Sequence, residues 1–205
     1  MVFEYRPERG MNHWKLRWEA TVPGHASIGR ELLTRWAEPQ RHYHSRTHLL
    51  AVLEAISVLE ATPPRAVVLA VWFHDAVYQG LPGRDEEDSA RLAETVLAGV
   101  VPVEEIRETA RLVRLTIEHN PGPNDYNGAL LCDSDLSILG SSEPEYAHYL
   151  AAVRQDYAHV SDHDFAKGRA AVVLELLALD PLFRLPQAQQ LWLEKAQQNL
   201  RSELH

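Results

Sequence analysis

Two short segments of this sequence place histidine and aspartate at spacings that suit metal binding. His44 and His48 are four residues apart, so on a helix their imidazole rings would share one face. His74 and Asp75 end an apolar run, residues 66–73, that should be buried on every side. A buried carboxylate needs a cation or hydrogen-bond donors to compensate it. The doublet is therefore either a structural pair or part of a metal site.

A third segment adds two acids, Asp133 and Asp135, beside an apolar stretch. By themselves these acids could simply interact with a helix dipole, and the histidine pair could lie on the surface at a helix start. The three segments together favour metal binding. Imidazole nitrogens and carboxylate oxygens form a borderline-to-hard ligand set, which suits Mn, Fe(II), Co, Ni or Mg better than a thiolate-preferring metal.

The elements that position these residues are expected to be helices, because Leu and Ala outnumber Val and Ile and no alternating strand pattern persists. Proline and glycine clusters separate the amphipathic segments. Asp85 is expected to cap one helix, and Ser142 with Glu145 forms a capping box for another. The expected helices span residues 27–37, 46–59, 64–78, 85–97, 102–118, 130–139, 142–158, 162–179 and 186–200.

Length and composition predict one all-α domain over residues 1–205. The formal net charge of −9 argues against a nucleic-acid polymer or an anionic membrane surface as a partner. The single cysteine, Cys132, excludes an internal disulfide and cysteine-based zinc sites. No apolar segment reaches the roughly 20 residues of a membrane span, and the first ten residues do not resemble a signal peptide. A cytoplasmic location is expected.

The order of these segments resembles the HD superfamily of metal-dependent phosphohydrolases, whose signature is a histidine, a His-Asp doublet and a distant aspartate on helices around one metal. The likeness is to its small stand-alone bacterial members and covers nearly the whole chain. It implies a single-domain HD-type helical bundle. The segments that carry the resemblance are 43–48 (YHSRTH), 72–78 (WFHDAVY), 86–90 (EEDSA), 116–119 (TIEH) and 133–140 (DSDLSILG).

The resemblance implies a role for each motif residue. The metal ligands would be His48, His74, Asp75 and Asp135, with Asp133 as the rival of Asp135. A further likeness, to the histidine motif of cyclic-nucleotide phosphodiesterases, makes His44 the acid that protonates the leaving group. The function implied is hydrolysis of a phosphoester or phosphoanhydride in a small phosphorylated substrate, such as a nucleotide.

Other candidates are less directly tied to the motif. Glu86 and Glu87 could orient the attacking water or bind a second metal, or could be helix-start acids. The candidates for substrate binding are Arg41, Arg46, Thr116 and His119. Arg41 could equally be a surface arginine, and His119 could interact with the end of a helix.

Three alternative functions remain open. The segment Asp133-Ser134-Asp135 also resembles the motif of haloacid-dehalogenase phosphatases, but that chemistry needs a parallel α/β sheet. Within the HD fold the chain could be a nucleotide sensor without turnover, or a di-iron oxygenase with His119 as an extra ligand. Tryptophans 14, 18 and 36 are expected in the core or at a homodimer surface.

Overall fold

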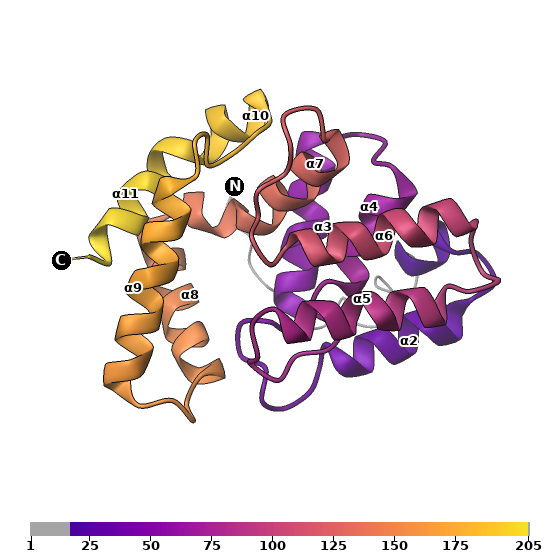
Figure 1. The fold of residues 1–205 in the computed structure, drawn as a ribbon, viewed down its shortest axis with the longest axis horizontal. Helices are drawn as coiled ribbons and strands as arrows, with labels where there is room; N and C mark the ends of the chain where they lie inside the picture. Colours follow the sequence, from indigo (N-terminus) through magenta and orange to yellow (C-terminus); the bar gives the residue numbers. More distant parts are fainter. Residues whose placement is uncertain (1–16, 205) are drawn as a thin grey trace.

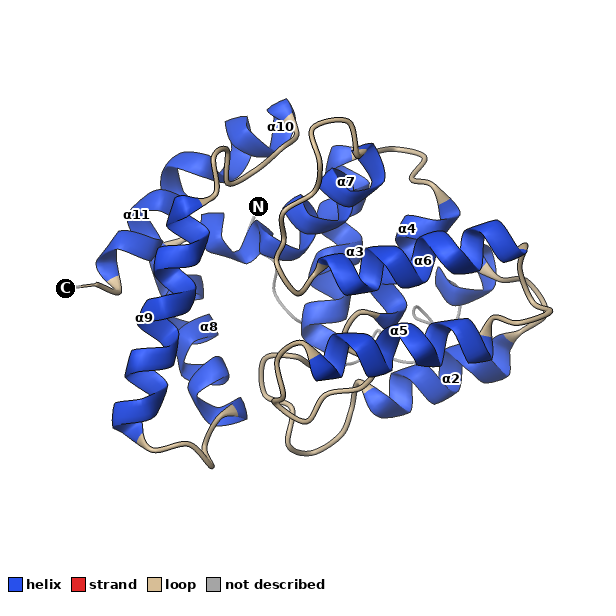
Figure 2. Ribbon diagram, viewed as in Figure 1, coloured by secondary structure: helices blue, strands red, loops and turns tan. Residues whose placement is uncertain are grey.

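The computed structural model describes residues 17–204, whose regular elements are all helices joined by loops, with no strand (Figure 2). This confirms the predicted all-α class. The helices are α2 (Ala26–Arg35), α3 (Arg46–Leu59), α4 (Arg65–Phe73), α5 (Arg84–Val96), α6 (Val103–Leu115), α7 (Tyr126–Asp135), the 3-10 helix η2 (Leu136–Gly140), α8 (Glu143–Asp156), α9 (Asp162–Ala178), α10 (Pro186–Ala188), the π-helical η3 (Gln189–Leu193) and α11 (Glu194–Ser202).

Two apolar cores hold these helices together. The first core lies among α2–α7, and its largest fully buried side chains include Trp18, Trp36 and Trp72. The second lies among η2 and α8–α11. Figure 1 shows α2–α6 on one side and α8, α9 and α11 on the other, with α7 between them. Leu59 and Leu185 pack against both cores, so the two halves of the described chain are in apolar contact.

Several predicted helix ends agree closely with the structure. Helix α3 has the predicted bounds, and the capping box of Ser142 and Glu145 is present at the start of α8. Trp18 and Trp36, which were expected in the core or at a homodimer surface, lie in the core at 1% and 0% exposure. Trp14 lies outside the described residues.

The predicted helix over residues 64–78 is too long, because α4 ends at Phe73. The backbone beyond this point bonds to other segments. The carbonyl oxygens of Asp75 and Ala76 accept hydrogen bonds from the Arg41 side chain, at 2.6 and 3.3 Å. The Val77 amide donates to the Ser89 hydroxyl at 3.0 Å. His74 and Asp75 therefore lie at a helix end, where the chain can turn both side chains inward.

Two predicted helix starts are also wrong. Helix α5 begins at Arg84, and Gly83 precedes it with a φ of 81°, a conformation that glycine adopts without strain. Asp85 is buried, and its carboxylate accepts bonds from the amides of Gln79 and Leu81. Helix α7 begins four residues before the predicted start, where Asp125 accepts a bond from the Gly128 amide. In both cases hydrogen bonds between an aspartate side chain and nearby backbone amides accompany the observed first residue of the helix.

Among the described residues, every helix is too short or too polar to cross a lipid bilayer.

Candidate metal centre

Four side chains meet where α3, α7 and the segment that follows α4 approach one another. His48 is the third residue of α3, and its residue exposure is 5%. His74 immediately follows α4, and Asp75 is the next residue. Asp135 is the last residue of α7. Each candidate ligand lies in the first turn of a helix or at a helix end. The apolar parts of these helices bury the site, and the backbone at the helix ends can bend so that the side chains face one another.

Three of these side chains have the geometry of a metal-binding group. One ligand atom each from His48, His74 and Asp135 lies within 4.8 Å of the others. The Nε2 atoms of His48 and His74 are 3.1 Å apart, and Asp135 Oδ1 lies 3.0 Å from His48 Nε2. Asp75 Oδ2 lies 3.2 Å from His74 Nε2 and 3.7 Å from His48 Nε2.

These separations fit one hexacoordinate ion. Ligand atoms about 2.1 Å from such an ion lie about 3.0 Å apart along an octahedral edge. The tautomer of His74 also suits this role, because its Nδ1 atom lies 2.8 Å from the Val71 carbonyl oxygen and donates to it. In the neutral ring the lone pair then belongs to Nε2, which faces the other ligands. The residues present therefore fit a divalent metal ion.

The electrostatics of the cluster also favour a cation. Burial alone would raise the pKa values of Asp75 and Asp135, but the neighbouring histidines lower both well below the usual range. Burial would lower the pKa of His74, yet the charges of Asp75 and Asp135 outweigh it and raise that pKa to about 9. The pKa of His48 is lowered, mainly by burial. Without a metal, His74 is therefore protonated at neutral pH, and its positive charge compensates part of the charge of the two ionised carboxylates.

Metal binding should therefore release about one proton at pH 7, because a ligating imidazole nitrogen must be deprotonated. Since the raised pKa of His74 is about 9, affinity should rise with pH up to that value and then level off. Calorimetric titration with Mn or Co in two buffers of different ionisation enthalpy measures the proton count. Equal heats in both buffers at pH 7 would contradict this expectation.

Asp133 and Asp135 have different surroundings in the structure. The Asp133 carboxylate accepts bonds from the amides of Arg184 and Leu185, at 2.9 and 2.7 Å. Burial raises the pKa of Asp133 to about 6 despite these bonds. Asp133 thus joins α7 to the segment before α10, whereas Asp135 belongs to the metal-binding group.

Replacing each acid with alanine should separate the two tasks. Asp133→Ala should lower the free energy of unfolding by about 1–3 kcal/mol, because two backbone amides lose their acceptor, and should keep the bound metal. Asp135→Ala should lose the metal. Chemical denaturation and elemental analysis of both variants measure the two effects. Loss of metal from Asp133→Ala, in protein shown to be folded, would reverse the assignment.

His119 forms a hydrogen bond with Asp135. Its Nε2 atom lies 2.8 Å from Asp135 Oδ2 and donates to it, while Oδ1 faces the two ligand histidines. His119 has a φ of 50°, which is unusual for a residue other than glycine. Such a conformation persists only where surrounding contacts maintain it. His119 therefore lies where it would orient Asp135, a candidate metal ligand, and the substrate-binding role that the sequence suggested stays a prediction.

His119→Ala should weaken metal binding by about 10–100-fold, the usual effect of removing a hydrogen-bond partner from a ligand. His119→Gln should lose less affinity, because its amide can still donate to Asp135. Competition against a chromogenic chelator measures both constants. Unchanged affinity in His119→Ala would restore the substrate-binding interpretation.

His44 lies close to the cluster but outside the helix. Helix α3 begins at Arg46, so His44 and His48 do not share a helical face as predicted. Instead, the His44 ring stacks on Tyr78, with centroids 4.4 Å apart, and meets the His48 ring edge-on at 5.8 Å. His44 also contributes to the lowered pKa of Asp75. The side chain is 22% exposed, so it lies beside the ligands with one part open to solvent.

The three other candidates for substrate binding are engaged with backbone carbonyls. The side chain of Arg41 is fully buried and donates to the carbonyl oxygens of His44, Asp75 and Ala76 as well as to Glu38. Arg46 donates to the Leu33 carbonyl at 2.8 Å, and the Thr116 hydroxyl donates to the Val113 carbonyl at 2.7 Å. These contacts give all three residues a structural task that their position in the sequence did not indicate.

Glu86 and Glu87 both lie at the start of α5 and have different surroundings. Glu86 accepts a bond from the Gly83 amide, and burial, with a contribution from the Asp75 charge, raises its pKa. Glu87 pairs with Arg114 and Arg91, which lower its pKa to about 2. The helix-start interpretation describes these contacts. A catalytic role for either residue stays a prediction.

One residue near His44 has no counterpart in the sequence-based candidates. Asp156, the last residue of α8, lies 2.8 Å from His44 Nδ1 through its Oδ2 atom. It lies seven residues after Tyr149, so the two share a face of α8. An acid that continues an otherwise apolar helix face was the signal available in the sequence.

Comparisons of this chain with protein-family models, with curated proteins and with solved structures found no match. Its chemistry is therefore inferred from its own side chains.

Proposed function

We propose that this chain is a metal-dependent phosphohydrolase of the HD type, which cleaves a phosphoester or phosphoanhydride bond in a small phosphorylated molecule such as a nucleotide. The observation that carries the proposal is the convergence of His48, His74 and Asp135, with Asp75 beside them, from separate helices onto one point. The order of these residues along the chain is the order of the HD signature, which supports the same proposal.

A divalent ion bound there would polarise a phosphoryl oxygen and lower the pKa of a coordinated water. The nitrogen and oxygen ligands favour Mn, Fe, Co, Ni or Mg. Four protein ligands leave two positions of a hexacoordinate ion for water and substrate. The chain contributes the ligand geometry, an apolar surround that strengthens electrostatic interactions, and neighbouring proton donors.

In this proposal His44 protonates the leaving oxygen. Its ring lies next to His48, stacks on Tyr78 and makes a T-shaped contact with Tyr43, with centroids 4.4 and 4.9 Å away from the two tyrosine rings. A positioned general acid contributes roughly 10²–10⁴-fold to rate. Because Arg41 is engaged with carbonyl oxygens, recognition of the phosphoryl group rests on the metal site and on the histidines around it.

A metal and substrate screen tests the proposal. Metal-free protein would be reloaded with Mn, Co, Ni, Mg or Fe(II) in turn and assayed for phosphate release from nucleotides and simple phosphate esters. We expect at least one metal to support turnover, and Asp135→Ala to be inactive with all of them. Binding of a nucleotide without turnover would favour a sensor, iron-dependent oxygen uptake would favour an oxygenase, and absence of metal binding would refute all three.

A further inference from the structure

The loop that carries His44 wraps around one buried carboxylate from the second half of the chain. Asp156 Oδ1 accepts a bond from the His42 amide, and the Tyr43 amide lies 3.3 Å from both carboxylate oxygens. Oδ2 accepts from the His44 amide at 3.2 Å. Three consecutive backbone amides thus point at one side chain whose exposure is 0%. Such an arrangement binds an anion tightly and fixes the path of the loop.

The same carboxylate also contacts the His44 ring. His44 Nδ1 lies 2.8 Å from Asp156 Oδ2. Burial would raise the pKa of Asp156, but the bonds from His44 and from the backbone outweigh it and lower the pKa, so the group is ionised at neutral pH. An ionised carboxylate only accepts hydrogen bonds. Nδ1 must therefore carry a proton, which leaves Nε2 as the nitrogen that can exchange one.

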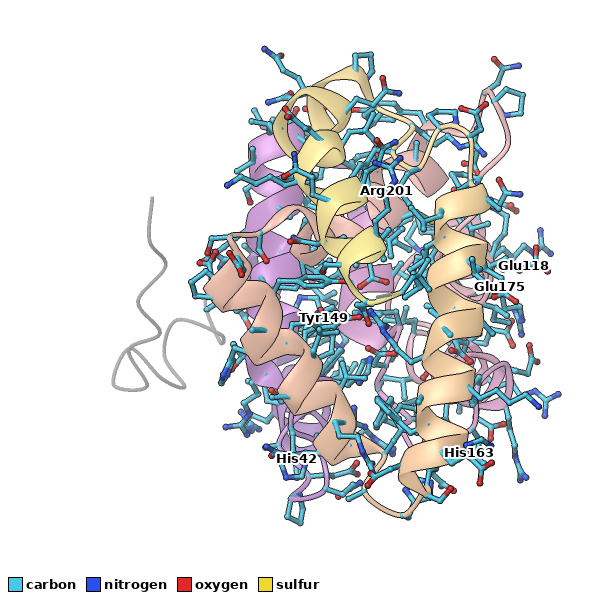
Figure 3. The ribbon with its side chains drawn as sticks, turned by 90° about the vertical axis from the view of Figure 1, so that its left-hand side faces the viewer. His42, Glu118, Tyr149, His163, Glu175 and Arg201 are labelled. Atoms are coloured by element: carbon cyan, nitrogen blue, oxygen red, sulfur yellow. The ribbon has the colours of Figure 1, made fainter. Side chains whose placement is uncertain are left out.

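Helix α8 is firmly attached to this loop. The Tyr149 ring, on the Asp156 face of α8, packs edge-on against Tyr43 with centroids 4.6 Å apart. Its hydroxyl accepts a bond from Arg169 of α9 at 3.0 Å, and Arg169 pairs with Glu203 at 2.7 Å. Figure 3 shows Tyr149 between α8 and α9, and His42 near the C-terminal end of α8. The second half of the chain therefore holds Asp156 in place.

We propose that Asp156 is a positioning residue, which accepts the Nδ1 proton of His44 in a hydrogen bond and so directs Nε2 to the substrate. Nε2 takes up a second proton from solvent, and the imidazolium then delivers that proton to the leaving oxygen and returns to the neutral form with its proton on Nδ1. This inference rests on the proposed function for its catalytic part. It adds a role for the C-terminal helices, because α8–α11 contribute none of the metal ligands and yet set the orientation of the general acid. Removing the Asp156 charge should impair protonation of the leaving group and leave the metal in place.

The first experiment determines the tautomer of His44 directly and does not depend on enzymatic turnover. Long-range proton–nitrogen correlation spectra of the ¹⁵N-labelled chain, at a pH where the His44 ring is neutral, show which nitrogen carries the proton, and His44→Asn identifies the signals. We expect the proton of His44 on Nδ1 in the wild type, and a mixture of tautomers in Asp156→Asn. A neutral His44 with its proton on Nε2 in the wild type would overturn the proposal.

The second experiment measures turnover on phosphate esters that differ only in leaving-group pKa. Asp156→Asn should lose 10²-fold or more in kcat on alkyl esters, roughly the contribution of a general acid, and less than about fivefold on nitrophenyl phosphate. The double variant with His44→Asn should lose no more than His44→Asn alone. Asp162→Asn is the control, since that carboxylate pairs with Arg154 and its side chain is 93% exposed.

The outcomes separate this proposal from the proposed function. An equal loss on all esters, or additive losses in the double variant, would give Asp156 a purely structural role and overturn the proposal. A wild type that hydrolyses none of the esters with any metal would refute the proposed function, while the tautomer measurement would still decide whether Asp156 orients His44. Thermal melting and metal content establish that Asp156→Asn is folded.

Discussion

His48→Asn should abolish both metal binding and turnover, whereas His44→Asn should keep the metal and lose turnover selectively. His48 Nε2 lies within 3.7 Å of the candidate ligand atoms of His74, Asp75 and Asp135, so its loss opens the ligand set and leaves two carboxylates with one imidazole. A metal ion supplies several kcal/mol of transition-state stabilisation, so the rate should fall on the order of 10³-fold or more. Elemental analysis and phosphate release measure the two effects.

His44→Asn should reduce kcat by about 10²–10⁴-fold on esters with poor leaving groups and least on nitrophenyl phosphate, whose leaving group departs without a proton. His163→Asn serves as a control, because His163 is an exposed residue of α9 (Figure 3). If His44→Asn lost the metal as readily as His48→Asn, both histidines would be ligands. If it kept both metal and turnover, His44 would have no catalytic part and the sensor function would gain support.

Arg41→Met should destabilise the fold by about 2–4 kcal/mol, because it removes a buried cation that donates to three carbonyl oxygens and to Glu38. Two of those carbonyls belong to Asp75 and Ala76, so the turn that presents a metal ligand should loosen and metal affinity should fall as well. Arg41→Lys should recover little, since one ammonium group cannot reach acceptors that diverge around a guanidinium. Denaturant unfolding and metal titration measure both effects.

The control for this variant is Arg84→Met, because the Arg84 side chain is 75% exposed and pairs with Asp88, one turn further along α5. It should leave the free energy of unfolding nearly unchanged. A stable Arg41→Met protein whose KM rises while metal content stays normal would return Arg41 to substrate binding, the role that its place beside the histidine motif suggested.

Local patterns in the sequence were enough for the class of the fold. The resemblance to the HD signature supplied the candidate metal ligands, with Asp133 left as a rival of Asp135. Helix α3 has its predicted bounds, because an apolar face of regular period and the surrounding turn residues define it without outside help. His48, His74 and Asp135 were expected as ligands, and the structure brings them together. Ligand groups carry a recognisable signature, since few residue types can bind a metal and burial must accompany them.

Only the tertiary structure decided the tasks of the residues around the ligands. Asp133 and Asp135 are indistinguishable by type and spacing, and the difference is which of them meets the amides of Arg184 and Leu185, about 50 residues away. Arg41 next to the histidine motif looked available to a phosphate, but its hydrogen bonds go to carbonyl oxygens that α4 leaves free by ending at Phe73.

Asp156 is the clearest example of a residue whose role only the tertiary structure reveals. Its contact with His44 joins positions 112 residues apart, through a carboxylate that has no motif around it. Hydrogen-bond partners of a buried polar group are chosen by which chain segments fold against it, and the period of a single helix carries no record of that choice. The sequence therefore determined which residues were candidates for binding a metal. The packing of the chain decided between Asp133 and Asp135, and the packing of α8 against the histidine loop determined how the His44 imidazole is held.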